Sequence, residues 1–455
     1  MRKELPSLLR LAKRALRRLA FVSGSSLLFT LAGQPSVAQL QLLKDINTSE
    51  EASYSEYSLL THGIGRMYYV SENELWKSNG TPESTQKLKS FKSISGLTMV
   101  GTTLYFAADD GTSGAELWKS NGTVGSTVRV KDIMEGPEGS SPHNLTAVGS
   151  ALFFAAYRST AGIELWRSDG TSAGTTMVKD IARGNSSPRN MVNVNGVLFF
   201  SATDGVNGHE LWKSDGTAAN TVMIKNIYAG KSNAYPEQLT AYGGKVYFSA
   251  YEPASGRELW VSDGTSAGTT QLKDIRPGSQ SSTPENLIVI KDKLMFTAHD
   301  GDHGDELWQT NGTISGTAMV KDMNPGGAGS NSTVSGRTMR AFSNMNGLLY
   351  FIAAKGDKEY IYRSDGTEAG TIILKQAYGV LSEAPQPEFT YMKGYVYFFN
   401  AESSFSESQA LLRIPYRGTP QEISFVRYFD GPFSWYADVP PVRNEMIHFY
   451  NNLYF

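Results

Sequence analysis

The sequence predicts an all-β fold, a β-propeller of four-stranded antiparallel blades, and three observations lead to it. The octapeptide Glu-Leu-Trp-Arg-Ser-Asp-Gly-Thr at 164–171 recurs along the chain, and a decayed copy stands at 360–367. The intervals between successive tryptophans of the repeat are 42, 48, 46, 48 and 48 residues. Such a period is typical of one repeated supersecondary unit. Within each period, short apolar runs alternate with turn residues, and no helical periodicity interrupts them.

Residues 1–38 precede the repeats and have the pattern of a cleavable signal peptide. Seven basic residues lead into an apolar stretch at 19–33, and small residues follow at 36–38. A membrane anchor is the alternative, but about 15 apolar residues fall short of the roughly 20 that a spanning helix needs. We therefore expect an exported protein that is secreted, periplasmic or at the cell surface. Arg17 and Arg18 leave a twin-arginine route open beside general secretion.

The remaining chain, 39–455, is expected to form one domain without a transmembrane span, and we expect a monomer. It carries 35 Lys+Arg against 43 Asp+Glu, a net charge of about −8. Nucleic acid is disfavoured as a partner because phosphate binding requires a basic face. The chain contains no cysteine, which excludes disulfides, thiolate metal sites and a cysteine nucleophile.

One period, 144–181, divides into four strands, which we call a (145–148), b (152–156), c (163–168) and d (175–181). Turn residues at 149–150 and 169–174 separate them as in consecutive hairpins. Copies of strand b are continuously apolar, which indicates burial on both faces between neighbouring blades. An open β-solenoid is the alternative, but its repeats are usually shorter.

Eight such units fit within 57–427, and seven or nine blades also agree with the sequence. A stray strand d at 42–46, within 39–56, and a strand pair at 446–455 remain outside this count. Because ring propellers often close by joining their two termini, we expect these ends to meet. The segment 428–455 holds nine aromatic residues, including Trp435, and is interpreted as a closing hairpin. A partner-binding surface or an outer-membrane strand are its alternatives.

The octapeptide has a structural interpretation that follows from its turn. If 169–174 form the loop, Trp166 faces Met177 and Glu164 faces Lys179. The same offset of 15 residues predicts six cross-strand ion pairs, namely Glu74–Lys89, Glu116–Lys131, Glu164–Lys179, Glu210–Lys225, Glu258–Lys273 and Glu306–Lys321. A catalytic role for these glutamates is disfavoured, since six identical general acids serve no single site.

The repeated tryptophans are interpreted as wedges between blades. Each ring buries about 200 Å², and a buried indole N–H would need an acceptor. A ring of exposed, sugar-stacking tryptophans is the functional alternative. The residues concerned are Trp76, Trp118, Trp166, Trp212, Trp260 and Trp308.

The motif Glu-Leu-Trp-x-x-Asp-Gly-Thr resembles the eponymous repeat of the ELWxxDGT-repeat family of exported bacterial proteins, over about 57–376. The resemblance implies a secreted or surface propeller-like protein and supplies no reaction. The loop and strand at 202–212 are also similar to the tryptophan-docking motif of quinoprotein-type propellers, which supports eight blades. No quinone or calcium ligand set accompanies that second likeness, and no cofactor is expected from it.

Ligand-specific surface is expected on the face formed by the d-to-a and b-to-c loops, which are longer and more variable than the strands. A candidate metal site lies in one b-to-c loop and would bind zinc or calcium. Its residues are His299, Asp300, Asp302, His303 and Asp305. The alternative is that this segment is another copy of the Asp-Gly-x-x-Gly loop found at 110–114 and 204–208, with additional polar residues that are exposed to solvent.

From these features we expect a non-enzymatic binding scaffold whose d-to-a face binds protein or glycan. The alternative is a propeller enzyme, either a hydrolase or quinoprotein-like, with its site on the same face. An enzyme should show two carboxylates, or a carboxylate and a histidine, within about 5–10 Å of each other on that face.

Overall fold

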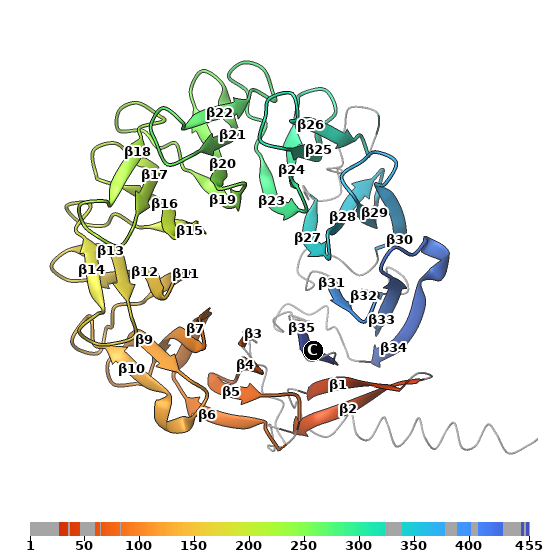
Figure 1. The fold of residues 1–455 in the computed structure, drawn as a ribbon, viewed down its shortest axis with the longest axis horizontal. Helices are drawn as coiled ribbons and strands as arrows, with labels where there is room; N and C mark the ends of the chain where they lie inside the picture. The colour runs from red at the N-terminus through yellow and green to blue at the C-terminus, as the bar shows by residue number, and fades with distance from the viewer. Residues whose placement is uncertain are drawn as a thin grey trace, which may run out of the picture.

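A computed structural model gives the fold for residues 27–34, 37–45, 60–63, 65–81, 83–323, 325, 339–377, 389–401, 408–430, 447–449 and 452–454. Eight four-stranded antiparallel sheets are arranged in a ring, which confirms the predicted eight-bladed propeller (Figure 1). We number the sheets as blades 1 to 8 in chain order.

The strands of the first four blades have the following bounds. Blade 1 contains β3 (Leu60–Gly63), β4 (Arg66–Ser71), β5 (Glu74–Ser78) and β6 (Gln86–Ser90). Blade 2 contains β7 (Ser93–Val100), β8 (Thr103–Asp109), β9 (Ala115–Ser120) and β10 (Val128–Lys131), with a 3-10 turn η1 (Val124–Ser126). Blade 3 contains β11 (His143–Val148), β12 (Ala151–Arg158), β13 (Gly162–Ser168) and β14 (Thr176–Lys179). Blade 4 contains β15 (Arg189–Val194), β16 (Val197–Thr203), β17 (His209–Ser214) and β18 (Val222–Lys225).

The other four blades repeat this order. Blade 5 contains β19 (Glu237–Tyr242), β20 (Lys245–Glu252), β21 (Gly256–Ser262) and β22 (Thr270–Lys273). Blade 6 contains β23 (Glu285–Ile290), β24 (Lys293–His299), β25 (Asp305–Thr310) and β26 (Ala318–Lys321). Blade 7 contains β27 (Arg340–Met345), β28 (Leu348–Lys355), β29 (Lys358–Ser364) and β30 (Ile372–Gln376). Blade 8 contains β31 (Phe389–Met392), β32 (Tyr395–Ala401), β33 (Ser408–Pro415) and β34 (Ser424–Asp430), with η2 (Pro420–Glu422).

Strands from the two ends of the chain meet between blades 8 and 1. The strand β1 (Leu27–Gln34) pairs with β2 (Val37–Asp45), and β35 (Ile447–Phe449) pairs with β36 (Asn452–Tyr454). The strands β1 and β36 are in contact, and β35 adjoins β31 of blade 8 (Figure 1). This contact is made by β1, which lies within the predicted leader at 1–38, whereas the predicted closing strand at 42–46 overlaps β2, the partner of β1. The rest of that leader and most of 428–455, including Trp435, lie outside the described residues.

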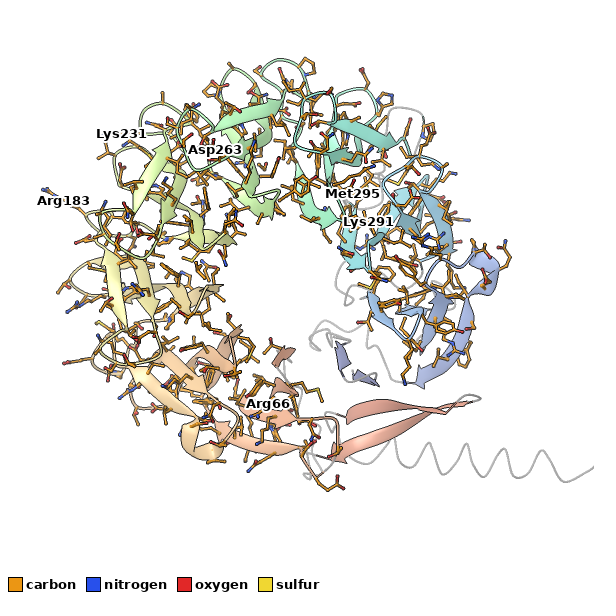
Figure 2. All side chains as sticks on the ribbon, viewed as in Figure 1. Arg66, Arg183, Lys231, Asp263, Lys291 and Met295 are labelled. Carbon is orange, nitrogen blue, oxygen red and sulfur yellow. The ribbon has the colours of Figure 1, made fainter. Side chains whose placement is uncertain are left out.

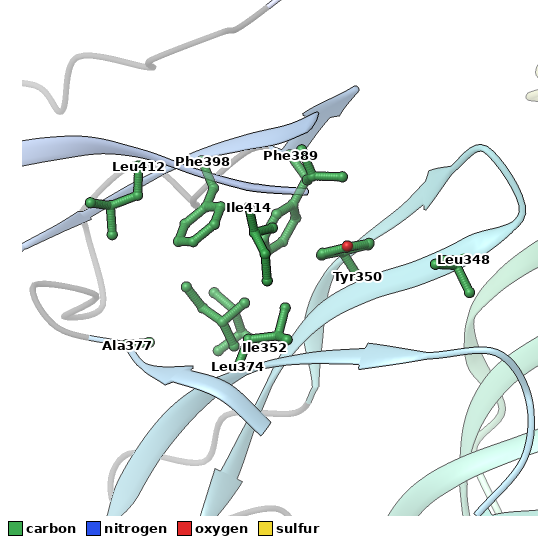
Figure 3. Packing of buried hydrophobic residues seen from close by; sticks show 11 residues of the cluster. Leu348, Tyr350, Ile352, Leu374, Ala377, Phe389, Phe398, Leu412 and Ile414 are labelled. Carbon is green, nitrogen blue, oxygen red and sulfur yellow. The ribbon is translucent and has the colours of Figure 1, made fainter. Parts of the chain in front are cut away.

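The core lies between blades, because each strand b is buried on both faces. Phe154 and Phe200, on strands b of blades 3 and 4, have no exposed surface. Figure 3 shows one such interface, where Tyr350 and Leu374 of blade 7 pack against Phe398 and Ile414 of blade 8. On the outside of the ring, exposed side chains such as Arg183 project from the loops (Figure 2). No helix in the part of the chain that the structure describes is both long and apolar enough to cross a membrane.

The tryptophans are wedges, as predicted. Trp166 is 2% exposed and packs with Tyr105 and Leu117 of the preceding blade. The expectation of an acceptor for the indole is wrong, since none of the six Nε1 atoms has a hydrogen-bond partner among the described residues. A lysine of the preceding blade lies over several of these rings, as Lys273 Nζ does at 5.7 Å from the ring centroid of Trp308. A positive charge over the π face contributes attraction of about 0.5–2 kcal/mol.

The six predicted Glu–Lys ion pairs are wrong, because a one-residue bulge interrupts the pairing of strands c and d. Trp166 opposes Met177 as expected, but Lys179 opposes Leu165 rather than Glu164. A one-residue shift sends a side chain to the other face of a sheet. The same shift occurs in blades 1, 2, 4, 5 and 6. In blade 1, Glu74 pairs instead with Lys87, at 2.8 Å.

The displaced lysines of blades 2 to 6 each connect their blade to the next. Lys179 Nζ donates to the carbonyl oxygen of Thr221 in blade 4 at 2.8 Å. Equivalent bonds of 2.7–2.8 Å join Lys131 to Thr175, Lys225 to Thr269, Lys273 to Thr317 and Lys321 to Thr371. The residue after the tryptophan adds a second bond, as Lys119 donates to the carbonyl oxygen of Gly170 at 2.7 Å.

The turn that accepts these lysines is held by its own side chains. Asp169 Oδ1 accepts from the backbone N–H and the hydroxyl of Thr171, both at 2.8 Å. Ser168 Oγ accepts from the N–H of Gly170 at 3.0 Å. Gly170 has a φ of 89°, and a Cβ there would lie 2.4 Å from the hydroxyl of Tyr105 in blade 2. Glycine is therefore required both by the backbone conformation and by the close approach of the preceding blade.

Gly170→Ala is expected to lower the free energy of unfolding by roughly 2–4 kcal/mol, from left-handed strain and the clash with Tyr105. Denaturant unfolding monitored by tryptophan fluorescence measures the change. Gly125→Ala is the matched control, because no atom lies within 4 Å of a Cβ built there. Equal stability of the two variants would contradict this account of the turn.

Candidate functional site

The repeated glutamates organise the loops of the d-to-a face. Glu164 is fully buried, and its Oε2 accepts from the N–H of Ile181 at 2.9 Å and from Ser186 Oγ at 2.6 Å. Glu116, Glu210, Glu258 and Glu306 accept hydrogen bonds from the equivalent loops of their own blades. Burial raises the pKa of Glu210 and Glu258 to about 7, against the hydrogen bonds, which lower it.

Two positions on this face differ in charge from blade to blade, at the start of strand a and the start of strand c. Blade 5 holds an ion pair there, with Arg257 Nη1 3.6 Å from Glu237 Oε2. Blade 7 holds another, with Arg340 Nη2 2.7 Å from Glu359 Oε2. Blades 4 and 6 depart from this pattern. Two bases, Arg189 and His209, occupy the positions in blade 4, and two acids, Glu285 and Asp305, occupy them in blade 6.

A pocket of about 210 Å³ opens beside the two acids of blade 6. Its lining comes from the loop before the blade and from three adjacent strands. The lining residues are Arg276, Ser281, Thr283, Glu285, Thr297, His299 and Asp305. The sheet register explains their meeting, because Glu285 opposes Thr297 and His299 opposes Asp305. The pocket lies on the d-to-a and b-to-c face, where the sequence predicts a site.

Both acids of the pocket favour the protonated form more than usual. Burial raises the pKa of Asp305, and the positive charges of Arg276 and of His299 in its protonated form oppose that shift. Burial likewise raises the pKa of Glu285, and the negative charges of Asp305 and Glu237 raise it further. The negative charge of Asp305 therefore disfavours ionisation of Glu285. Such a pair can hold one proton while the second group stays ionised.

The five predicted metal ligands do not form one centre. His299 and Asp305 line the pocket, whereas Asp300 accepts from His303 Nδ1 at 2.7 Å. Asp302 donates its N–H to Asp300 Oδ1 at 3.0 Å, as in a loop of the Asp-Gly-x-x-Gly type. Within the described ranges, no group of three or more histidine, aspartate or glutamate side chains is arranged to hold a metal ion.

His299 has a defined tautomer. Its Nδ1 accepts a hydrogen bond from the N–H of Gly301 at 2.8 Å, which leaves Nε2 to carry the proton of the neutral ring. The imidazole can therefore donate through Nε2 next to the carboxyl groups.

Sequence inspection missed Glu285 and Arg276. Neither belongs to a contiguous motif, and they precede His299 by 14 and 23 residues. A comparison of the repeats with one another would have shown that the charge at this position varies, because it is arginine in blades 4 and 7 and glutamate in blades 5 and 6. Position 276 lies in a loop that varies in every repeat, so no such signal exists there.

No family model matches the sequence, and no curated protein does. Solved structures with a similar fold include a prolyl endopeptidase, with a TM-score of 0.44 and 14% identity over 79% of this chain and 54% of that chain. A puromycin-hydrolyzing peptidase of Mycobacterium tuberculosis matches with a TM-score of 0.39 and 10% identity over 77% and 55%. Prolyl oligopeptidase B of Galerina marginata matches with a TM-score of 0.42 and 10% identity over 76% and 51%.

This chain spans about half the length of these structures, and at 10–14% identity the likeness concerns the fold alone. The predicted non-enzymatic binding scaffold has no counterpart among them, since all three are enzymes, and that prediction is wrong by this comparison. The alternative of a propeller enzyme agrees with the pocket, where two carboxyl groups and a histidine line one cavity on the predicted face.

The buried glutamates of the repeat predict that the stability of the protein depends on pH. A glutamate with an ordinary pKa of 4.5 that rises to about 7 on folding takes up a proton when the chain folds. The contribution of this glutamate to the free energy of unfolding is fully present below pH 4.5 and is lost as the pH rises through 7. Glu258→Gln should reduce the difference in unfolding free energy between pH 5 and pH 8 by roughly 1–3 kcal/mol.

Chemical denaturation at the two pH values measures this difference. Glu83→Gln is the control, because Glu83 is exposed in the turn of blade 1 and should leave the pH dependence unchanged. An unaltered pH dependence in Glu258→Gln would show that this carboxyl group does not change protonation on folding.

Proposed function

We propose that this propeller is a hydrolase whose acid–base chemistry is performed by Glu285 and Asp305 in the blade 6 pocket. The observation that carries the proposal is that two acids, both lining the pocket, occupy the positions where blades 5 and 7 each hold one acid and one base. Like charges close together disfavour ionisation, and the charge of Asp305 raises the pKa of Glu285. Their presence beside a pocket is expected where the carboxyl groups serve a reaction.

The chemistry divides between the two groups. The protonated carboxyl group donates its proton to the leaving-group oxygen, and the ionised one removes a proton from the attacking water. We assign Asp305 as the acid, because it lies opposite His299, whose neutral ring carries the Nε2–H and can donate a hydrogen bond that orients the carboxyl group. Glu285 is then the base. Glycosidic bonds are the class that a pair of carboxyl groups commonly hydrolyses, and they are the proposed substrates.

Export and membership of the ELWxxDGT-repeat family also remain proposals. The basic and apolar leader at 1–38 supports export, and the six copies of the octapeptide support the family. A glycan outside the cell would agree with both.

Hydrolysis of a panel of 4-nitrophenyl glycosides by the chain tests the function. Glu285→Gln and Asp305→Asn should each lower kcat by about 10²–10⁴-fold, the range for removal of a general acid or base. Azide should restore part of the activity of whichever variant lacks the base if it replaces the water as nucleophile.

Glu359→Gln is the matched control, because Glu359 stands at the start of strand c in blade 7 and belongs to an ion pair. This variant should keep its kcat. Absence of glycoside hydrolysis by the intact protein, or full activity of both pocket variants, would refute the proposal.

A further inference from the structure

Besides the indole of Trp212 and the amide of Asn226, blade 4 holds a group of buried polar atoms without a hydrogen-bond partner among the described residues, one from each of three adjacent strands. They are Arg189 Nε on β15, Ser201 Oγ on β16 and His209 Nδ1 on β17. Arg189 opposes Ser201, and His209 enters the sheet two residues further along β16, opposite Thr203. Buried polar atoms are nearly always hydrogen-bonded, so three unpartnered atoms in one cluster require a missing acceptor or donor.

The charge of this cluster is also uncompensated. No carboxylate lies within ion-pair distance of Arg189 in the described part of the chain, although Arg340 at the equivalent position of blade 7 is paired with Glu359. Burial, and then the positive charge of Arg189, lowers the pKa of His209 to about 4. The imidazole is thus neutral near pH 7 and leaves Arg189 as the cation of the cluster.

An aromatic side chain covers the cluster. The ring of Tyr235 stacks on His209 with centroids 5.6 Å apart, and the Arg189 guanidinium carbon lies 5.0 Å from the Tyr235 centroid. The equivalent positions hold small side chains with the same left-handed backbone, namely Ser141, Ser187 and Thr283. Tyr235 adopts a φ of 46° and is 37% exposed. A bulky residue in this conformation is a strained substitution for serine, as found at ligand-binding positions.

We propose that Arg189, Ser201 and His209 form an oxyanion-binding site on blade 4, covered by Tyr235. A carboxylate, sulfate or phosphate group would accept hydrogen bonds from the Arg189 Nε–H and the Ser201 hydroxyl, and from His209 in its Nδ1–H tautomer. The inference is independent of the proposed hydrolysis and concerns a different blade.

The site lies on the same face as the acid pocket and is linked to it through blade 5. Arg257 Nη1 donates to the carbonyl oxygen of Tyr235 at 3.0 Å, and the charge of Arg257 also acts on Glu285. An anionic group bound on blade 4 would therefore lie on the side of the pocket that faces blade 5. An acidic glycan is a ligand that would suit both sites.

Titration with sodium acetate, sulfate and phosphate tests the site, at an ionic strength kept constant with sodium chloride. The Nε–Hε resonance of Arg189 should shift saturably, and Arg189→Gln should weaken the binding, followed through the histidine resonances, by about tenfold or more. Tyr235→Ser should retain binding, because it removes the cover and leaves the three binding atoms. The three anions distinguish a carboxylate site from a sulfate or phosphate site.

Arg340→Gln is the matched control, because Arg340 has the same position in blade 7 and is paired with Glu359. It should bind the anions as the unaltered protein does, and circular dichroism establishes that each variant is folded. Linear, non-saturating shifts, or equal binding by Arg189→Gln and the unaltered protein, would overturn the proposal and indicate that water alone occupies the cluster.

Discussion

The one-residue bulge between strands c and d determines where the two charged side chains of each repeat go. It removes the lysine from the glutamate that the strand pattern offers as its partner, as Lys179 is removed from Glu164. The lysine then reaches a carbonyl oxygen of the next blade, and the glutamate turns into the loop of its own blade. Contacts between blades and the shape of the d-to-a loops therefore depend on the same irregularity.

Much of the architecture could be predicted from the sequence, because it depends on period and turn chemistry. The strands predicted at 145–148, 152–156 and 163–168 lie within β11, β12 and β13. The error in the ion-pair prediction has a physical origin. A bulge is a local gain of one residue, and neither the apolar pattern nor the regular spacing of Glu and Lys contains a mark of it. Six repetitions of one spacing only repeated the same error.

The candidate site shows a similar limit. Its face could be predicted from loop length, and His299 and Asp305 stood out because they share one short loop. The pocket, however, is made by strands a, b and c together with the preceding loop, which brings Arg276 and Glu285 beside them. Such neighbours depend on the sheet register and have no fixed spacing along the chain. Only a comparison of the blades, position by position, separates the residues of the framework from those of the face.

The carboxylate of Glu164 holds its loop through the N–H groups of Ile181 and Ser186 and through one serine hydroxyl. Most of the loop's other side chains take no part in that attachment. Substitutions at these positions can therefore accumulate without destabilising the propeller, so the loops of different repeats can be exchanged. A loop transplanted from one blade to another, with its serine kept, would carry its surface chemistry to a new sector of the ring.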